Sequence, residues 1–174
     1  MMHAPNPARA FSLLELVVVI AILGVVASIA APRLASASGN AIDASIRANV
    51  AQLEHAIEYY AAEHDNRTPA EEPDGKPIDD ESLFIKRLLI PTKVTGEFDE
   101  RFPLGPYLRD IPANPANGRR RIRIDGDPAG ADTHGWRFDS ALRMIEPDDP
   151  EQADKLRKAA ELLGGTAVQA QPAK

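Results

Sequence analysis

The chain has 174 residues, a formal net charge of −6, and a hydrophobic content of 44%. It contains no cysteine, which excludes a disulfide framework and thiolate metal sites. The acidic balance argues against binding to nucleic acid, and the length allows one domain with a modest core behind an N-terminal segment.

The N-terminal region is dominated by an apolar stretch over residues 11–31, in which Glu15 is the only charged residue. As a helix this stretch would span roughly 32 Å, close to the hydrocarbon thickness of a bilayer. A cleaved secretory signal has a shorter apolar region, although residues 35–37 could supply its cleavage site. An uncleaved anchor fits the length but leaves Glu15 unexplained, because an acid at the centre of a membrane helix costs about 2.5–3.5 kcal/mol.

The residues around this acid are recognisable. The sequence AFSLLE (residues 10–15), followed by the apolar stretch and Pro32, resembles the N-terminus of type IV pilins and type II secretion pseudopilins. In that family a prepilin peptidase cuts before a Phe that is then N-methylated, and a Glu and a Pro are the fifth and twenty-second residues of the mature chain. Counted from Phe11, Glu15 and Pro32 match both positions. The resemblance implies a leader at residues 1–10 and cleavage between Ala10, where the family usually has Gly, and Phe11.

Physical reasoning gives the two matching residues a role in assembly. Cleavage would expose an amine on Phe11, and the Glu15 carboxylate could pair with that amine on a neighbouring subunit. Two buried charges cost less paired than alone, so the pair would favour one register between subunits. Pro32 lacks an N–H for the Ser28 carbonyl, which loosens or kinks the helix there.

Beyond Pro32 the helical pattern resumes. Six apolar residues recur at intervals of four, four, three, four and three, which places them on one face of a helix: Ile42, Ile46, Val50, Leu53, Ile57 and Tyr60. The sequence therefore predicts one long helix, with a transmembrane or filament-core part at residues 11–32 and an amphipathic continuation at residues 33–64.

A globular head is predicted over residues 65–146, and a tail that is partly helical or disordered over residues 147–174. Within them we expect a short helix at 80–89, a surface loop at 105–118 and a helix at about 151–163. Three short strands are predicted from apolar residues: Ile122 and Ile124 in the first, Trp136 and Phe138 in the second, and Leu142 and Met144, with Ile145 as an optional further member, in the third. The predicted fold class is α+β and pilin-like, with the long helix packed on a small antiparallel sheet.

The loop DGDPAGADTHG (residues 125–135) brings together Asp125, Asp127 and Asp132. Such oxygen-rich loops can bind Ca²⁺, and the resemblance implies a calcium loop in this region of major pseudopilins. The spacing of an EF-hand fails, because it needs an oxygen ligand at Ala129 and a Glu at Trp136. A solvated hairpin loop is the favoured interpretation, with these three residues kept as calcium candidates and no other cofactor expected.

No catalytic arrangement is visible, because the four histidines are scattered and no nucleophile motif is present. The arginines of residues 119–123 could contact nucleic acid. However, Arg121 and Arg123 occupy outward strand positions, where charge is expected, and no aromatic stacking platform accompanies them.

The resemblance implies a structural subunit, not an enzyme, of the pilus-like filament of a type II secretion system. It would lie in the inner membrane with a periplasmic C-terminal domain. Its partners would be copies of itself, other pseudopilins, the prepilin peptidase, an inner-membrane assembly platform and membrane lipid. The alternatives are a minor pilin of a type IV pilus or of DNA uptake, a monomeric signal-anchored periplasmic binding protein, and a secreted soluble protein cut after Ala37.

Overall fold

The computed structural model describes residues 12–162, which fall into two compact units divided between Ala41 and Ile42. The predicted leader, the cleavage site between Ala10 and Phe11, and the end of the predicted tail lie outside the described residues. The unit that begins at Ile42, called the head below, contains all of the strands and the two shorter helices.

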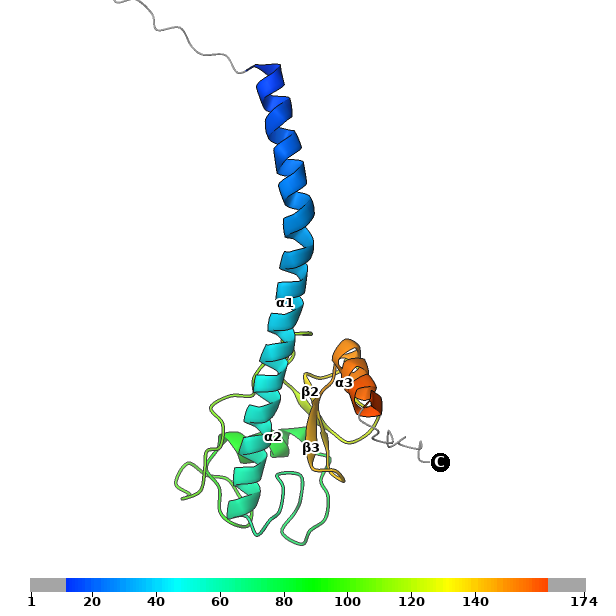
Figure 1. The fold of residues 1–174 in the computed structure, drawn as a ribbon. Coiled ribbons are helices and arrows are strands. Elements are labelled where there is room, and N and C mark those ends of the chain that lie inside the picture. Colours follow the sequence, from blue (N-terminus) through cyan, green and yellow to red (C-terminus); the bar gives the residue numbers. More distant parts are fainter. Residues whose placement is uncertain (1–11, 163–174) are drawn as a thin grey trace, which may run out of the picture. The chain divides into compact units, whose positions relative to one another are not determined.

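The helix α1 (Leu13–Glu63) confirms the prediction of one long N-terminal helix (Figure 1). Helical structure continues across Pro32, although this residue has no N–H for the Ser28 carbonyl. Two hydroxyls near the proline bond back to carbonyls of the preceding turn: Ser28 Oγ donates to the Val25 carbonyl at 2.7 Å and Ser36 Oγ to the Pro32 carbonyl at 3.1 Å. The proline is therefore accommodated within a helix that does not end there.

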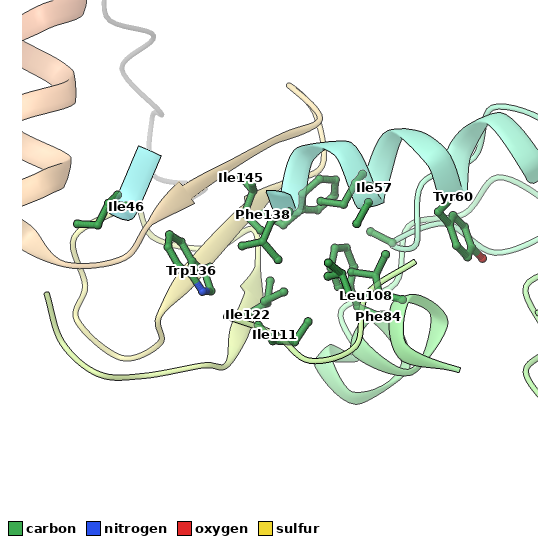
Figure 2. Packing of buried hydrophobic residues seen from close by; sticks show 14 residues of the cluster. Ile46, Ile57, Tyr60, Phe84, Leu108, Ile111, Ile122, Trp136, Phe138 and Ile145 are labelled. Atoms are coloured by element: carbon green, nitrogen blue, oxygen red, sulfur yellow. The ribbon is translucent and has the colours of Figure 1, made fainter. Parts of the chain in front are cut away.

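The apolar stripe predicted on the second half of α1 forms one wall of the head core (Figure 2). Four of its six residues are buried and the other two, Ile42 and Val50, are half-buried against them. Burial of one large apolar side chain contributes about 1.5–3 kcal/mol. The facing residues come from α2, the following loop and the sheet: Phe84, Leu88, Leu108, Ile111, Ile122, Trp136, Phe138 and Ile145.

The helix α2 (Glu81–Leu89) agrees with the predicted helix at 80–89. The side chain of Asp80 caps its N-terminus by accepting the Leu83 amide at 3.1 Å. Residues 105–118, predicted as a surface loop, instead cover part of the core. Leu108, Ile111 and Asn114 in that loop are buried, so the prediction of surface exposure was wrong for them.

The sheet contains β1 (Ile122–Ile124), β2 (Trp136–Asp139) and β3 (Met144–Pro147) in that spatial order. β2 and β3 are antiparallel as predicted, but β1 and β2 are parallel. The predicted antiparallel meander was therefore wrong, and the sheet is mixed. A parallel neighbour requires the chain to return to the starting end of the first strand, which residues 125–135 accomplish as a crossover. The predicted hairpin loop was wrong for the same reason.

The third strand also starts later than predicted. Leu142 lies in the turn before β3 and is 56% exposed, and Met144 is 47% exposed, whereas Ile145 points into the core. The preceding Arg143 has a left-handed backbone (φ +56°), and this turn sets which residues of β3 face inward. The helix α3 (Pro150–Leu162) follows, close to the predicted bounds of 151–163.

Candidate functional site

The first part of α1 exposes its apolar side chains on every side. All thirteen large apolar residues from Leu13 to Leu34 are between 44% and 80% exposed. Among the described residues, this is the one helix that is long and apolar enough to cross a membrane, a criterion that N-terminal signal sequences also meet. Soluble monomers rarely expose a continuous apolar surface of this kind, so the segment requires lipid or other helices around it.

Glu15 lies in the first turn of α1 and is exposed. The carbonyl of Ser12 accepts the amide of Leu16 at 3.2 Å, which makes Ser12 the residue that opens the helix. Ser12 and Glu15 thus have the S-x-x-E spacing of a capping box, and an acid in the first turn also complements the helix dipole. The sequence analysis did not use this spacing, although the serine three residues before the glutamate is visible in the sequence.

Glu15 and Pro32 mark the two ends of the apolar segment. They are seventeen residues apart in one helix, roughly 26 Å along its axis, so the structure does not bring these two predicted assembly residues together. Each residue would therefore contribute to assembly at its own end of the segment. Glu15 would do so through its carboxylate in the first turn, and Pro32 through its missing backbone N–H near the last apolar residues.

The three aspartates predicted as calcium candidates do not converge. Both carboxylate oxygens of Asp125 bind Ser140, at 2.7 Å from its amide and 2.6 Å from its hydroxyl. Asp132 accepts hydrogen bonds from Asn117 and Arg119 at 3.1 and 2.5 Å, and Asp127 is exposed. Within residues 12–162, no group of three histidine or acidic residues is arranged to hold a metal ion.

A buried histidine that the sequence had not singled out lies at the end of α1. His64 is 1% exposed and stacks on Tyr60 with ring centroids 3.6 Å apart. Its Nδ1 is 2.6 Å from the Tyr60 carbonyl, which only accepts, so Nδ1 carries the proton and Nε2 accepts from the Thr92 hydroxyl at 3.0 Å. Burial lowers the pKa of His64, although hydrogen bonds with backbone groups of Tyr60 and Lys93 act to raise this pKa. Both ring nitrogens are occupied within the fold, which indicates a structural role.

Comparisons with known proteins agree with the N-terminal geometry. A family model described as the prokaryotic N-terminal methylation motif matches residues 5–31. Type II secretion system core protein G of Pectobacterium carotovorum subsp. carotovorum is 33% identical over 108 residues, which cover 62% of this chain and 61% of that protein. The chain thus matches about three fifths of the length of this relative. No solved structure matches significantly.

These matches bear on the fold class as well as the motif. The long apolar N-terminal helix and the small sheet form the α+β architecture expected from the resemblance. By its name, the similar core protein G is a component of a secretion system, which agrees with the prediction that this chain is a structural subunit and not an enzyme. The methylation motif and the similarity to core protein G support the resemblance of residues 10–32 to the type IV pilins and type II secretion pseudopilins, and the architecture is consistent with it.

Proposed function

We propose that this chain is a structural subunit of the pilus-like filament of a type II secretion system. The observation that carries the proposal is Glu15, which is the only charged residue in the exposed apolar part of α1 and lies within the residues that the methylation motif matches. The name of the similar core protein G favours a secretion system over a type IV pilus or DNA uptake. The methylation motif by itself fits all three systems.

Processing supplies the charge that Glu15 needs. A prepilin peptidase cuts between Ala10 and Phe11, and the new amine is N-methylated and remains cationic. Phe11 precedes Glu15 by four residues in the sequence, so the new amine and the carboxylate of each subunit would be close enough for the amine of one subunit to meet the carboxylate of the next. Leaving one member of a buried ion pair without its partner costs about 3–5 kcal/mol. Any other axial register between neighbouring subunits would separate the amine from the carboxylate, so this cost disfavours it.

Before assembly, the apolar part of α1 lies in the inner membrane with the polar head on the periplasmic side. During assembly, helices of other subunits replace the lipid around it in the filament core, and Pro32 adjusts the helix at the edge of that core. The partners are copies of this chain, other pseudopilins, the prepilin peptidase and the inner-membrane assembly platform.

Intact-mass measurement of the protein from its native membrane tests the processing step. We expect a chain that begins at N-methylated Phe11. A chain that begins at Met1 or Met2 would instead indicate an uncleaved anchor on a monomeric protein. A chain that begins at Ser38 would indicate a secreted soluble protein, and either result would contradict the proposal.

Two substitutions separate an assembly role of Glu15 from a capping role. Glu15→Gln keeps a side chain that can complete the capping box but removes the negative charge, whereas Ser12→Ala removes the cap and keeps the charge. With normal membrane insertion of both, we expect Glu15→Gln to reduce filament yield at least about tenfold and Ser12→Ala to leave it nearly unchanged. The reverse pattern would assign Glu15 to capping and contradict the charge-pairing mechanism.

A further inference from the structure

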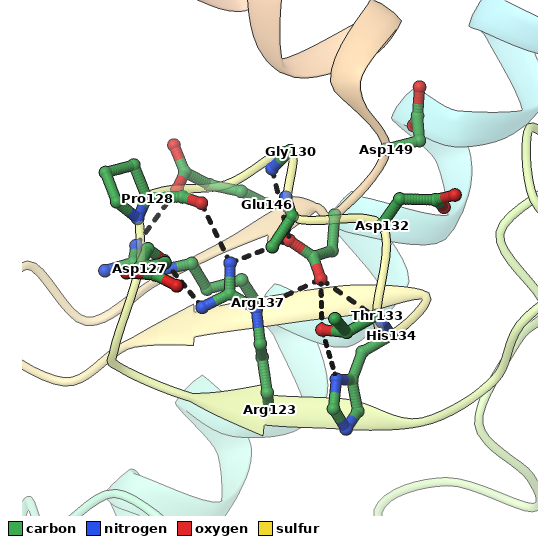
Figure 3. Close-up of polar contacts among 12 residues, drawn as sticks. Arg123, Asp127, Pro128, Gly130, Asp132, Thr133, His134, Arg137, Glu146 and Asp149 are labelled. Atoms are coloured by element: carbon green, nitrogen blue, oxygen red, sulfur yellow. Dashed lines mark hydrogen bonds and ion pairs between the residues drawn. The ribbon is translucent and has the colours of Figure 1, made fainter.

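Arg123 of β1 lies at the centre of the crossover loop and gathers its oxygen atoms (Figure 3). Its Nη1 donates to the backbone carbonyls of Asp125 and Asp127 at 2.7 and 2.6 Å. Its Nη2 donates to the carbonyl of Pro128 at 2.9 Å. The Asp148 carboxylate closes the ring by accepting from Nε and Nη2 at 3.0 and 2.7 Å. Five oxygen atoms thus surround one guanidinium group, whose side chain is only 12% exposed.

The Asp148 carboxylate organises the rest of the same loop. It is fully buried and accepts the amides of Gly130, Ala131 and His134 at 3.1, 3.2 and 3.2 Å. Burial acts to raise its pKa, but Arg123 and these amides outweigh burial and hold the pKa of Asp148 below its usual value. The Asp148 carboxylate is therefore ionised. Its ion pair with Arg123 connects the first part of the crossover, residues 125–128, to the second part, residues 130–134.

This arrangement can be compared with what calcium requires. Ca²⁺ takes six to eight oxygen ligands at about 2.3–2.6 Å, often backbone carbonyls together with carboxylates. Here the convergent carbonyls and the carboxylate already bind a guanidinium, while the side chains of Asp125 and Asp132 bind other partners. A metal ion among the same oxygens would have to share them with a fixed positive charge. The residues of this loop therefore do not fit the calcium site that the resemblance implies.

We infer that Arg123 is the resident cation of the crossover loop and holds it in place of a metal ion. The guanidinium is covalently attached and does not lose its proton in proteins, so the loop stays ordered regardless of calcium concentration. This inference concerns the head alone and does not depend on the proposed filament.

Hydrogen exchange of the peptide covering residues 126–135 tests the inference, measured on the full chain in detergent. We expect the wild-type exchange rates to be the same in millimolar calcium and in chelator. Slower exchange in calcium would overturn the inference, and this comparison requires no variant.

The same hydrogen-exchange measurement on the variant Arg123→Lys is the second test of the inference. Lysine keeps the charge but lacks the planar fork that spans the carboxylate and three carbonyls. We expect exchange of the loop amides to be at least about tenfold faster, with the fluorescence of Trp136 confirming a folded head. The control is Arg121→Lys, because the Arg121 side chain is 70% exposed and binds Glu81 outside the loop. Unchanged loop exchange in a folded Arg123→Lys variant would overturn the inference.

Discussion

Arg87 is a buried cation whose replacement should destabilise the head strongly. It lies in the last turn of α2, and its side chain is 3% exposed. Its Nη1 donates to the carbonyls of Pro69 and Glu71 at 3.0 and 2.9 Å, and its Nε donates to the carbonyl of Gly96 at 3.3 Å. Its Nη2 lies 3.2 Å from the carboxylate of Glu72. One side chain thus connects α2 to two separate loops.

The substitution Arg87→Met keeps the apolar stem and leaves three carbonyls without their donor. Hydrogen bonds from a charged donor contribute about 1.5–3 kcal/mol each, although water can replace part of this when the loops open. The Glu72 side chain is 40% exposed, so the ion pair itself adds no more than about 1 kcal/mol. We expect a loss of about 3–4 kcal/mol, which corresponds to a decrease in Tm of roughly 10 °C for a chain of this size.

Thermal unfolding of the full chain in detergent measures this loss through the fluorescence of Trp136, the only tryptophan, which is fully buried in the head. The matched control is Glu72→Gln, which removes the charge of the carboxylate but none of the three carbonyl contacts. It should lower the Tm by no more than about 3 °C. If Arg87→Met lowers the Tm no further than Glu72→Gln does, the carbonyl contacts do not stabilise the head and the reasoning fails.

Two further predictions use the same fluorescence assay. Burial lowers the pKa of His64 in the folded state, so as the pH falls the unfolded chain binds a proton at this residue before the folded chain does. The free energy of unfolding should therefore be unaffected by His64 above about pH 6.5 and should decrease as the pH falls toward 5. His64→Phe should flatten the dependence of Tm on pH in this window, and an unchanged slope would argue against His64 as its source. A Cβ added at Gly135 would lie 2.2 Å from the Arg119 carbonyl oxygen, so Gly135→Ala should destabilise the head by more than about 3 kcal/mol. Gly39→Ala, with no atom within 4 Å of the added Cβ, should leave head unfolding unchanged, and equal effects of the two substitutions would refute the steric argument.

Local periodicity was sufficient to predict the helices. The spacing of Ile46, Leu53 and Ile57 follows the helical repeat, and these residues are buried in the core as expected. The same holds for α2, where Asp80 provides the cap and Phe84 faces inward. These features depend on residues within a few turns of each other, so the sequence alone contains the necessary information.

Alternation of residues was a poorer guide in the sheet. Arg123 was predicted to occupy an outward strand position because it alternates with apolar residues, and the same pattern around Arg137, between Trp136 and Phe138, would place that residue outward too. Arg137 is instead 7% exposed and lies between Asp139 and Glu146, at 3.0 and 3.2 Å. Period-two alternation distinguishes the two faces of a strand, but it does not reveal whether the second face is covered as well.

The sequence by itself determined the long N-terminal helix, the single acid within its apolar part and the positions that match the pilin motif, because all of these depend on neighbouring residues. Only the tertiary structure decided that β1 and β2 run parallel and that Arg123 meets Asp148, twenty-five residues further along the chain. A strand of three residues has no preferred direction of its own. Its pairing and its charged partners are set by the path of the crossover and by burial of the sheet, which exist only after the chain has folded back on itself.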